Sequence, residues 1–327
     1  MNKFLVIQTA FIGDVILATA LVEQIKAQHQ NAVIHFLLRK GTENVLENNP
    51  NIEKVFIWDK IKNKYVNYVS ILKLIRTEKY SHVLNVHRYF SSGFITILSQ
   101  AKETVGFDKN PLSLFFTKKI KHEFGTNNHP VHEVERNARL IEHIVDNQCV
   151  KPKIYPQKKD YLKIQPIGSY ITISPNSVWF TKQWPIEKWT DFIDRVGGEL
   201  SIYLLGGGND ISLCNKIKLS TNHRKVEVVA GKLSLLESAA LMAGAKMNFV
   251  NDSAPLHLAS AINAPVTAIF CSTIPAFGFT PLSDDSVVLE SPILLKCRPC
   301  SLHGKKACPK QHFKCADIQV ERLLERL

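Results

Sequence analysis

The sequence predicts an α/β protein built from two doubly wound domains, and three observations carry this prediction. Runs of β-branched and aromatic residues alternate with helix-like runs along both halves of the chain. Such continuous apolar strands are typical of parallel sheets that helices cover on both faces. The alternation breaks in the Lys- and Pro-rich stretch 150–168, which has no clear period. We therefore expect one domain over residues 1–160 and a second over 161–327.

The predicted elements follow this alternation in order. In the first half we expect strands at "KFLVIQ", "AVIHFLLR", "KVFIWD" and "SHVLNV", with helices at "DVILATALVEQIKAQ" and "VNYVSILKLIRTE". In the second half we expect strands at "YITISP", "SIYLLG", "VEVVAG", "MNFVN" and "VTAIF", with helices at "IEKWTDFIDRVG", "NDISLCNKIKLS", "SLLESAALMAGA" and "APLHLASAIN". Ligands of paired doubly wound domains bind beyond the carboxyl ends of the strands, so functional residues are expected directly after strands.

Composition is that of an ordinary globular protein, with 45% hydrophobic and 21% charged residues in 327. Lys and Arg exceed Asp and Glu by 12. This excess indicates an anionic partner, such as nucleic acid, a phosphorylated sugar or an anionic membrane face, unless the charges simply solvate the surface. The N-terminal segment has the outline of a signal peptide, but Asp14 interrupts its apolar core. We therefore predict the first strand and helix of a cytoplasmic domain there, and no apolar run is long enough to span a bilayer.

The stretch "VNDSAPLHLAS" predicts an anion site at a helix N-terminus. Asp252 ends a strand, Ser253 is a favourable N-cap, and Pro255 suits the first helical turn. The N–H groups of such a helix end point toward the ligand and attract a phosphate or diphosphate. His257 lies in the first turn and is placed to add a donor to the same anion. Capping alone also accounts for Ser253 and Pro255.

Two further loops follow predicted strands and carry charged candidates. In "TAFIGDVIL", Gly13 is expected to relieve a tight turn, and Asp14 begins a helix as either a general base or a simple cap. In "SPNSVWFTKQWP", Lys182 is placed to neutralise a phosphate leaving group, although a solvated lysine is the default interpretation. The glycines of "LLGGGND" permit close approach of a ligand. They do not complete the dinucleotide fingerprint, and no phosphate-binding P-loop motif is present.

The C-terminal tail segment 297–315 contains a cluster of cysteines, Cys297, Cys300, Cys308 and Cys315. Their spacing allows a structural zinc site, with the second pair loosely spaced. An irregular loop with reduced thiols is the alternative, and reduced cytoplasmic thiols fit the odd total of seven cysteines.

Taken together, these motifs resemble glycosyltransferase family 9, the bacterial lipopolysaccharide heptosyltransferases. The resemblance rests on "GDVILATALVEQIK", "SPNSVWFTKQWP", "AGKLSLLESAALMAGAKMNFVNDSAPLHLASA", "FCSTIPAFGFTP" and the tail "CRPC…CP…HFKC". The last two look most like the heptosyltransferase II branch. The resemblance implies a GT-B fold, in which two Rossmann-like domains face each other across a cleft, with the acceptor on the first and the nucleotide sugar on the second.

The resemblance also implies inverting, metal-independent transfer of heptose from ADP-heptose to the inner core, with no cofactor. Asp14 matches the family's proposed base, and Lys182 matches the lysine that balances the leaving diphosphate. The donor site implied by the resemblance consists of Leu233, Asp252, Ser253, Ala254 and His257. Asp210 is the candidate for the ribose contact, because Ser212 stands where the family often has Glu. Candidate acceptor contacts are Gly13, Arg88 and Lys109.

Departures from the family pattern leave the identity of the sugar and base open. Family members commonly have Gly in place of Ala254 or Pro255. The expected partners are an ADP-heptose donor, an anionic lipopolysaccharide core and the cytoplasmic face of the inner membrane, and no nucleic acid. The alternatives are the same fold with another nucleotide sugar and acceptor, a dinucleotide-dependent oxidoreductase, a non-catalytic family member, and a basic zinc-knuckle protein that binds nucleic acid.

Overall fold

The computed structural model describes residues 2–126, 129–146 and 150–327 and contains two compact units. Met1–Thr126 and Val131–Tyr155 form unit 1, and Pro156–Leu327 forms most of unit 2. Each unit is built on a six-stranded sheet, and every strand pair between neighbours is parallel. The predicted α/β class with two doubly wound sheets is therefore confirmed.

The sheet of unit 1 has the strand order β3-β2-β1-β4-β5-β6. Its strands are β1 (Lys3–Ile7), β2 (Val33–Arg39), β3 (Lys54–Trp58), β4 (His82–Asn85), β5 (Glu103–Phe107) and β6 (Lys118–Ile120). Its α-helices are α1 (Ile12–Gln28), α2 (Lys64–Thr77), α3 (Phe90–Leu98) and α4 (Glu133–Ala138), and short 3-10 turns occur at η1 (Glu43–Leu46) and η2 (Ser113–Phe115).

The sheet of unit 2 has the order β12-β11-β10-β7-β8-β9, which is the same topology read from the other edge. Its strands are β7 (Tyr170–Ser174), β8 (Ser201–Leu204), β9 (Val226–Val228), β10 (Met247–Asn251), β11 (Val266–Phe270) and β12 (Ser286–Glu290). Its α-helices are α5 (Lys158–Tyr161), α6 (Ile186–Arg195), α7 (Ile211–Ser220), α8 (Leu235–Ala243), α9 (Ala254–Ala261) and α10 (Glu321–Leu324). The 3-10 turns are η3 (Phe180–Lys182), η4 (Gly208–Asp210), η5 (Pro275–Phe277) and η6 (Lys314–Ala316).

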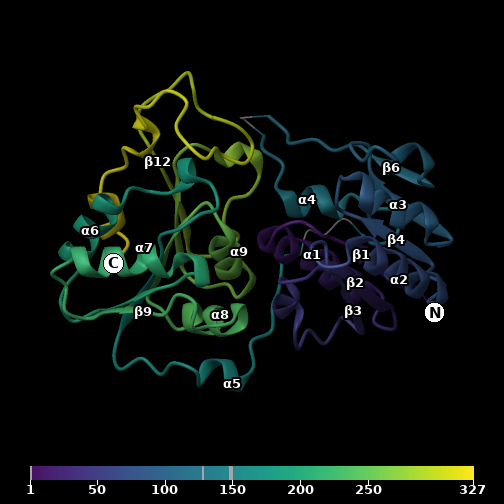
Figure 1. Cartoon of the computed structure of the whole chain (residues 1–327), viewed down its shortest axis with the longest axis horizontal. Coiled ribbons are helices and arrows are strands. Elements are labelled where there is room, and N and C mark those ends of the chain that lie inside the picture. The colour runs from purple at the N-terminus through teal and green to yellow at the C-terminus, as the bar shows by residue number, and fades with distance from the viewer. Residues whose placement is uncertain (1, 127–128, 147–149) are drawn as a thin grey trace. The chain divides into compact units, whose positions relative to one another are not determined.

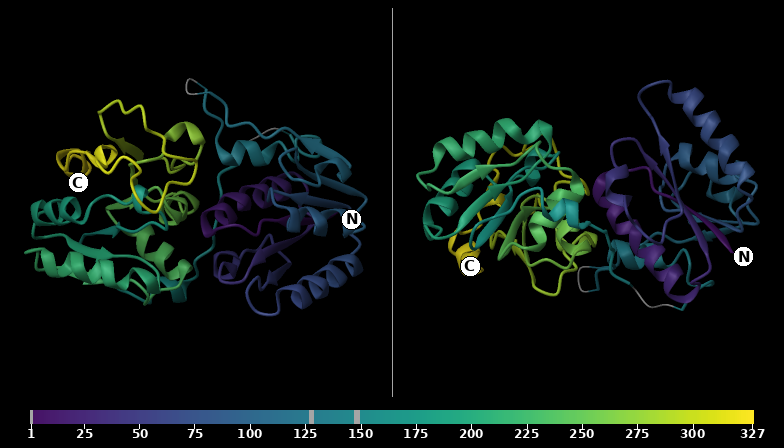
Figure 2. Two further views of the ribbon diagram at one scale, coloured as in Figure 1. Left: turned by 45° about the horizontal axis from the view of Figure 1, so that its top comes forward. Right: turned by 90° about the horizontal axis from the view of Figure 1, so that it is seen from below.

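Helices cover both faces of each sheet, which explains why the central strands are apolar throughout. In unit 1, α1 contacts α4 while α2 contacts α3, and Figure 2 shows α1 and α2 on opposite faces of the sheet. All four residues that follow Lys3 in β1 are buried, and every residue of β7, β10 and β11 is buried. Burial on both faces removes the need for the alternating polar residues of a half-exposed strand.

Three strands were not expected from the sequence: β5, β6 and β12. β6 is three residues long, contains two lysines and lies at a sheet edge, and β12 is only half-buried at the edge of the other sheet. Edge strands need not be apolar on both sides, so their pattern is weak. Helix α1 begins at Ile12, two residues before the predicted start. None of the helices in the described part of the chain is both long and apolar enough to cross a membrane.

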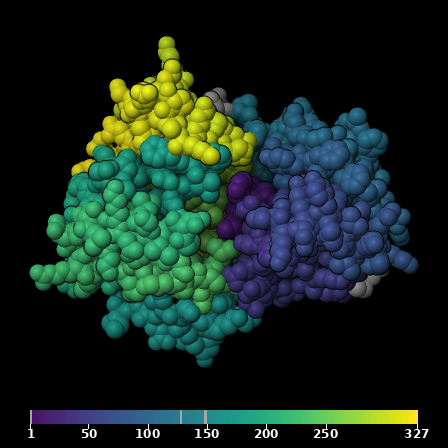
Figure 3. Space-filling view, in the orientation of Figure 1, coloured from purple at the N-terminus to yellow at the C-terminus, as the bar shows by residue number. Residues whose placement is uncertain are grey.

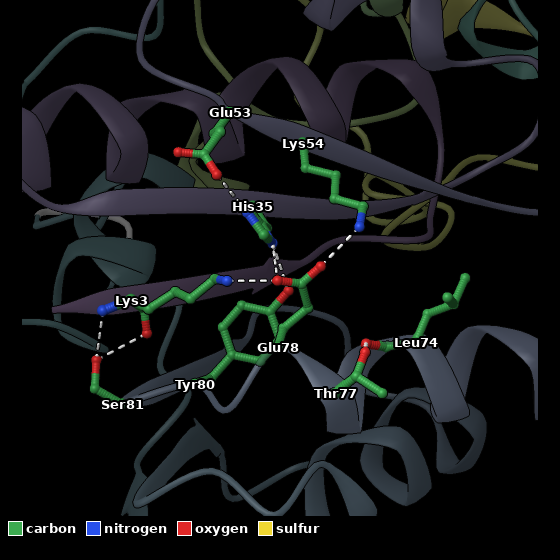
Figure 4. Close-up of polar contacts among 9 residues, drawn as sticks. All are labelled: Lys3, His35, Glu53, Lys54, Leu74, Thr77, Glu78, Tyr80 and Ser81. Carbon is green, nitrogen blue, oxygen red and sulfur yellow. Dashed lines mark hydrogen bonds and ion pairs between the residues drawn. The ribbon is translucent and has the colours of Figure 1, made fainter. Parts of the chain in front are cut away.

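A polar cluster joins the amino ends of the unit 1 strands (Figure 4). Glu78, just after α2, forms ion pairs with Lys3 at the start of β1 and with Lys54 at the start of β3, where Nζ lies 2.7 Å from Oε1. These lysines lower the pKa of Glu78 to about 2. Buried His35 of β2 has its Nδ1 2.7 Å from the Tyr80 hydroxyl, and burial lowers its pKa. The cluster ties together three strands and α2 at the edge opposite the functional candidates.

Candidate functional site

The strand orders define where each sheet is best suited to bind a ligand. In unit 1, β2 and β3 lie on one side of β1, and the later strands β4, β5 and β6 lie on its other side. In unit 2 the same reversal lies between β7 and β10. At such a switch point the loops beyond the carboxyl ends diverge and leave a crevice, which is where open α/β sheets bind ligands.

In unit 1, Asp14 and Arg88 follow the two strands of the switch point, β1 and β4. Asp14 is the third residue of α1, and its Oδ2 accepts the backbone N–H of Phe11 at 3.1 Å. Burial raises the pKa of Asp14, and the N–H bond and the charges of Arg88 and Arg39 oppose this rise. A carboxyl group of raised pKa at this position is suited to accept a proton. It also serves as the helix cap, so the two interpretations of Asp14 are compatible.

The structure gives less support to the other two acceptor candidates, Gly13 and Lys109. Gly13 lies inside α1 and is not among the glycines of positive φ, so it does not form the tight turn that the sequence suggested. The α-helix begins earlier than expected and includes this residue. Lys109 is exposed in the loop after β5, at the same edge of the sheet, and none of the described hydrogen bonds or ion pairs joins it to Asp14.

Sequence reasoning missed a buried polar chain at the same edge of unit 1. Lys60, after β3, donates from Nζ to the carbonyl of Thr9 at 2.8 Å, and the Thr9 hydroxyl lies 3.0 Å from His87 Nδ1. Burial and the nearby charge of Arg39 lower the pKa of Lys60 to about 8. Burial and the charges of Lys60 and Arg88 lower the pKa of His87 to about 3. Burial is the larger cause of both shifts, and the neighbouring cations add to it. The available signal was position, because each residue follows a strand.

In unit 2, Lys182 and Asp252 follow the switch-point strands and form a direct ion pair. Lys182 ends η3 after β7, Asp252 directly follows β10, and Nζ lies 2.7 Å from Oδ2. The same Oδ2 accepts the Thr273 hydroxyl at 2.6 Å, from the loop after β11. Both charged side chains are largely buried, at 14% and 6% exposure. Three motifs that are distant in the sequence therefore meet at one point.

Helix α9 begins at this point, and Ser253 occupies its N-cap position as predicted. Its hydroxyl does not cap the helix, however, and instead donates to the carbonyl of Asn176 at 3.3 Å. The bond to the Asn176 carbonyl in the loop after β7 takes the place of the expected cap. Ala254 is the first residue of α9, and His257 is buried within it against the ring of Phe279.

Asn176 was missed and links several of these loops. Its side chain donates to Asp210 Oδ1 and accepts from Gln183 Nε2 at 2.7 Å, and its carbonyl accepts the Ser253 hydroxyl. Asp210 Oδ2 also accepts the N–H of Gly207 at 2.8 Å. Asp210, the candidate for the ribose contact, therefore also shapes the Gly-rich turn after β8. An uncharged residue in a loop gave no sequence signal for this role.

Leu233 lies half-buried in the loop between β9 and α8. A pocket of about 280 Å³ adjoins this loop and is bounded by α7, β9 and the two residues that precede Leu233. Its lining residues include Ile211, Asn215, Gly231 and Lys232. The pocket thus lies beside the backbone that the resemblance assigns to the adenine.

The cysteine-rich tail supports the Lys182 loop. Thr181 and Lys305 form two hydrogen bonds, from Thr181 N to the Lys305 carbonyl at 3.1 Å and from Lys305 N to Thr181 Oγ1 at 2.8 Å. The Arg298 side chain donates to the carbonyls of Cys271 and Thr273 at 2.7 and 2.6 Å. Figure 3 shows the tail as a yellow layer on the surface of unit 2.

The structure does not support the zinc candidate. Cys297 Sγ lies 3.8 Å from His312 Nε2, while burial raises the pKa of Cys315 to about 11. Across the described ranges, no three His, Cys, Asp or Glu side chains are grouped so that they could hold a metal ion. Cys297, Cys300, Cys308 and Cys315 are free thiols, and the segment instead packs as an irregular tail.

Comparison with known proteins places these features in context. The profile of glycosyltransferase family 9 (heptosyltransferase) matches residues 68–311. Lipopolysaccharide heptosyltransferase 3 of Escherichia coli is 26% identical over 296 residues, which cover 85% of each chain. The structure of E. coli ADP-heptose lps heptosyltransferase II has a TM-score of 0.82 at 18% identity, over 99% of this chain and 97% of that one. That of E. coli heptosyltransferase WaaC with ADP-2-deoxy-2-fluoro heptose has a TM-score of 0.74 at 19% identity, over 99% of both chains.

Proposed function

Because the chain belongs to glycosyltransferase family 9, the heptosyltransferases, we propose that it transfers heptose from ADP-heptose to the inner core of lipopolysaccharide. The observation that carries the proposal is the meeting of Lys182, Asp252 and the N-terminus of α9 at the switch point of unit 2. This arrangement joins a fixed cation to the positive end of a helix, and it suits the diphosphate of a nucleotide sugar.

We assign the donor to unit 2 and the acceptor to unit 1. Lys182 and the backbone N–H groups of Ser253 and Ala254 hold the diphosphate, and His257 adds a donor from the same helix. The loop at Leu233 holds the adenine, and Asp210 holds the ribose. Asp252 orients Lys182 through the 2.7 Å ion pair and is itself fixed by Thr273.

Transfer proceeds by a single displacement that inverts the anomeric centre. The acceptor hydroxyl loses its proton to the Asp14 carboxylate as its oxygen forms a bond to the anomeric carbon. The bond between that carbon and the diphosphate oxygen breaks, and its electron pair leaves with ADP. Lys182 and the α9 N-terminus stabilise the negative charge that develops on the leaving group.

The acceptor is an anionic sugar, and unit 1 offers a positive potential for it. Arg39, Lys60 and Arg88 all act on the groups around Asp14. Arg88, Gly13 and Lys109 are the proposed acceptor contacts, and Lys60 joins them on structural grounds. We place the reaction at the cytoplasmic face of the inner membrane, where such an acceptor is available to this chain.

A calorimetric screen of donors tests the proposal. We expect ADP-heptose to bind more tightly than GDP-, UDP- or CMP-sugars, and Lys182→Ala to weaken ADP binding by about 10-fold or more, the loss of one charge-assisted contact. Because Lys182 and the N-terminus of α9 balance the charge of the diphosphate, transfer is expected to persist in EDTA. Preference for another nucleotide would reassign the donor, and unchanged ADP affinity in Lys182→Ala would remove the diphosphate role.

A further inference from the structure

One surface of unit 1 combines exposed apolar side chains with several basic residues. It comprises the turn before α2 and the outer face of that helix, and we call it the α2 surface. Its apolar members are Ile61, Tyr65, Val66 and Val69, and its basic members are Lys62, Lys64, Lys73 and Arg76. This surface takes no part in the site described above.

The apolar members are unusually open to solvent. Ile61 is 96% exposed, Tyr65 78%, Val66 69% and Val69 50%. Apolar side chains of this size are normally buried in the core, and the same helix buries Ile71 and Ile75 on its inner side. A set of exposed apolar residues in one place marks an interaction surface.

Helix geometry places the apolar and basic residues on one stripe. Tyr65, Val69, Lys73 and Arg76 follow one another at intervals of four, four and three residues, so they lie along the same side of α2. The stripe is apolar in the first half of the helix and positive in the second. Lys62 and Lys64 add further positive charge at the apolar end.

Aromatic residues of α3 lie beside α2 and contact its Tyr68. Phe94 stacks on Tyr68 of α2, with ring centroids 6.3 Å apart, and on Phe90, at 6.1 Å. Phe90 is more than half exposed. The Tyr68 hydroxyl donates to the carbonyl of Ser91 at 2.7 Å and fixes the two helices to each other.

The charge of the segment points to one class of partner. Residues 60–77 contain five basic residues and no acidic residue. Apolar side chains among lysines, without any carboxylate, fit a layer of anionic headgroups over an apolar interior. A protein partner would instead need a matching acidic face for each separate lysine.

We propose that the α2 surface docks unit 1 onto a membrane that contains anionic phospholipids. The aromatic and aliphatic side chains enter the boundary between headgroups and acyl chains, and the basic residues contact the headgroup phosphates. The choice of a membrane rests on the proposed function, whose acceptor is lipid-anchored. Lys60, which bonds to Thr9 near Asp14, joins the α2 surface to the acceptor edge of the sheet.

Vesicle co-sedimentation of the full chain tests this proposal without donor or acceptor. Vesicles of phosphatidylglycerol and phosphatidylcholine are compared with phosphatidylcholine alone. We expect binding to the former only, with the partition coefficient falling about 10-fold or more in Lys73→Glu/Arg76→Glu. The matched control Lys158→Glu/Lys159→Glu makes the same change in net charge at exposed positions of α5 and is expected to bind as the wild type does.

Three results would overturn the proposal: no binding of the wild type to anionic vesicles, equal binding to neutral ones, or an equal loss in both charge variants. Val66→Ser/Val69→Ser tests the apolar half and is expected to reduce binding without changing net charge. Circular dichroism checks the fold of each variant. Because no sugar transfer is measured, a failure of the heptosyltransferase proposal leaves this result interpretable.

Discussion

At the scale of single residues, Asp14 combines a structural role at the start of α1 with the proposed role of general base. It accepts the Phe11 N–H at the start of α1, and it lies at the switch point of unit 1 with a raised pKa. Loss of the side chain would therefore disturb both the helix end and proton transfer. A substitution that retains the hydrogen-bond acceptor separates the two.

We expect Asp14→Asn to lower kcat by about 10²–10⁴-fold, because the amide still accepts the Phe11 N–H but cannot take up a proton. Binding of ADP, measured by calorimetry, is expected to stay unchanged. In the wild type, the pH–rate profile of kcat/KM should fall as the pH decreases through the raised pKa of Asp14, where the base becomes protonated. A variant that retains most of its activity would show that another group accepts the proton.

Gly304, in the C-terminal tail, packs closely against Lys182 and has a backbone conformation that favours glycine. Its φ is +82°, and a Cβ there would lie 3.0 Å from Lys182 Cγ and 3.1 Å from Trp179 Cβ. We expect Gly304→Ala to destabilise the chain by about 1–2 kcal/mol and to lower kcat/KM for the donor by about 10-fold through displacement of Lys182. Thermal unfolding and donor kinetics measure the two effects.

Gly198→Ala is the matched control, because a Cβ at Gly198 meets nothing within 4 Å and its φ is not positive. It is expected to behave as the wild type. Equal donor kinetics in the two variants would show that the tail does not position Lys182.

At the scale of elements, the Glu78 cluster fastens α2 to the amino ends of β1 and β3. Two ion pairs hold the carboxylate in its charged form, so folding lowers its pKa to about 2 from the usual 4.5. A lowered carboxyl pKa contributes stability above the unfolded-state pKa, and this contribution is lost as the pH falls toward the folded-state value.

We expect Glu78→Gln to reduce the free energy of unfolding by about 1–2 kcal/mol at pH 7, after allowance for the solvent contact of the lysines. The difference from wild type should stay constant down to about pH 4.5 and close between there and pH 2. Urea unfolding at several pH values measures it. The exposed Glu47→Gln is the control, and an equal effect of the two variants would contradict a specific role for the cluster.

The elements also show which features of the fold and the site could be predicted from the sequence. The central strands were predicted because burial on both faces requires uninterrupted apolar runs. Asp14, Lys182 and Asp252 could be chosen as candidates because they come after such strands. β6 and β12 were missed because edge strands tolerate polar residues. Asn176 was missed because its partners Asp210 and Ser253 are 34 and 77 residues away and it carries no charge. The cysteine spacing allowed a zinc site as one of two interpretations and could not decide between them, because spacing along the chain does not fix where the side chains point.

At the scale of the whole molecule, net charge is the dominant feature. The excess of 12 positive charges attracts anions over a distance set by ionic strength, which favours the proposed acceptor and the proposed membrane surface. The heptosyltransferase family was identifiable from the sequence, whereas a heptosyltransferase 3 and a heptosyltransferase II are both similar to this chain, so the branch stays a prediction.

We expect the KM for a phosphorylated core acceptor to rise several-fold between 0.05 and 0.5 M NaCl, values at which the Debye length falls from about 14 to about 4 Å. Salt screens the half-buried cationic edge of unit 1 more strongly than the largely buried Lys182–Asp252 pair. The KM for the donor should therefore change less over the same range in steady-state kinetics. An equal rise for both substrates would assign the effect to general screening.

The two sheets share one strand order, each with its switch point beside its own first strand. If each unit binds one of the two substrates, separate stretches of the gene encode the specificity for the activated sugar and the specificity for the molecule that receives it. Hybrid enzymes made by joining halves from two relatives near residue 155 should then inherit one preference from each parent.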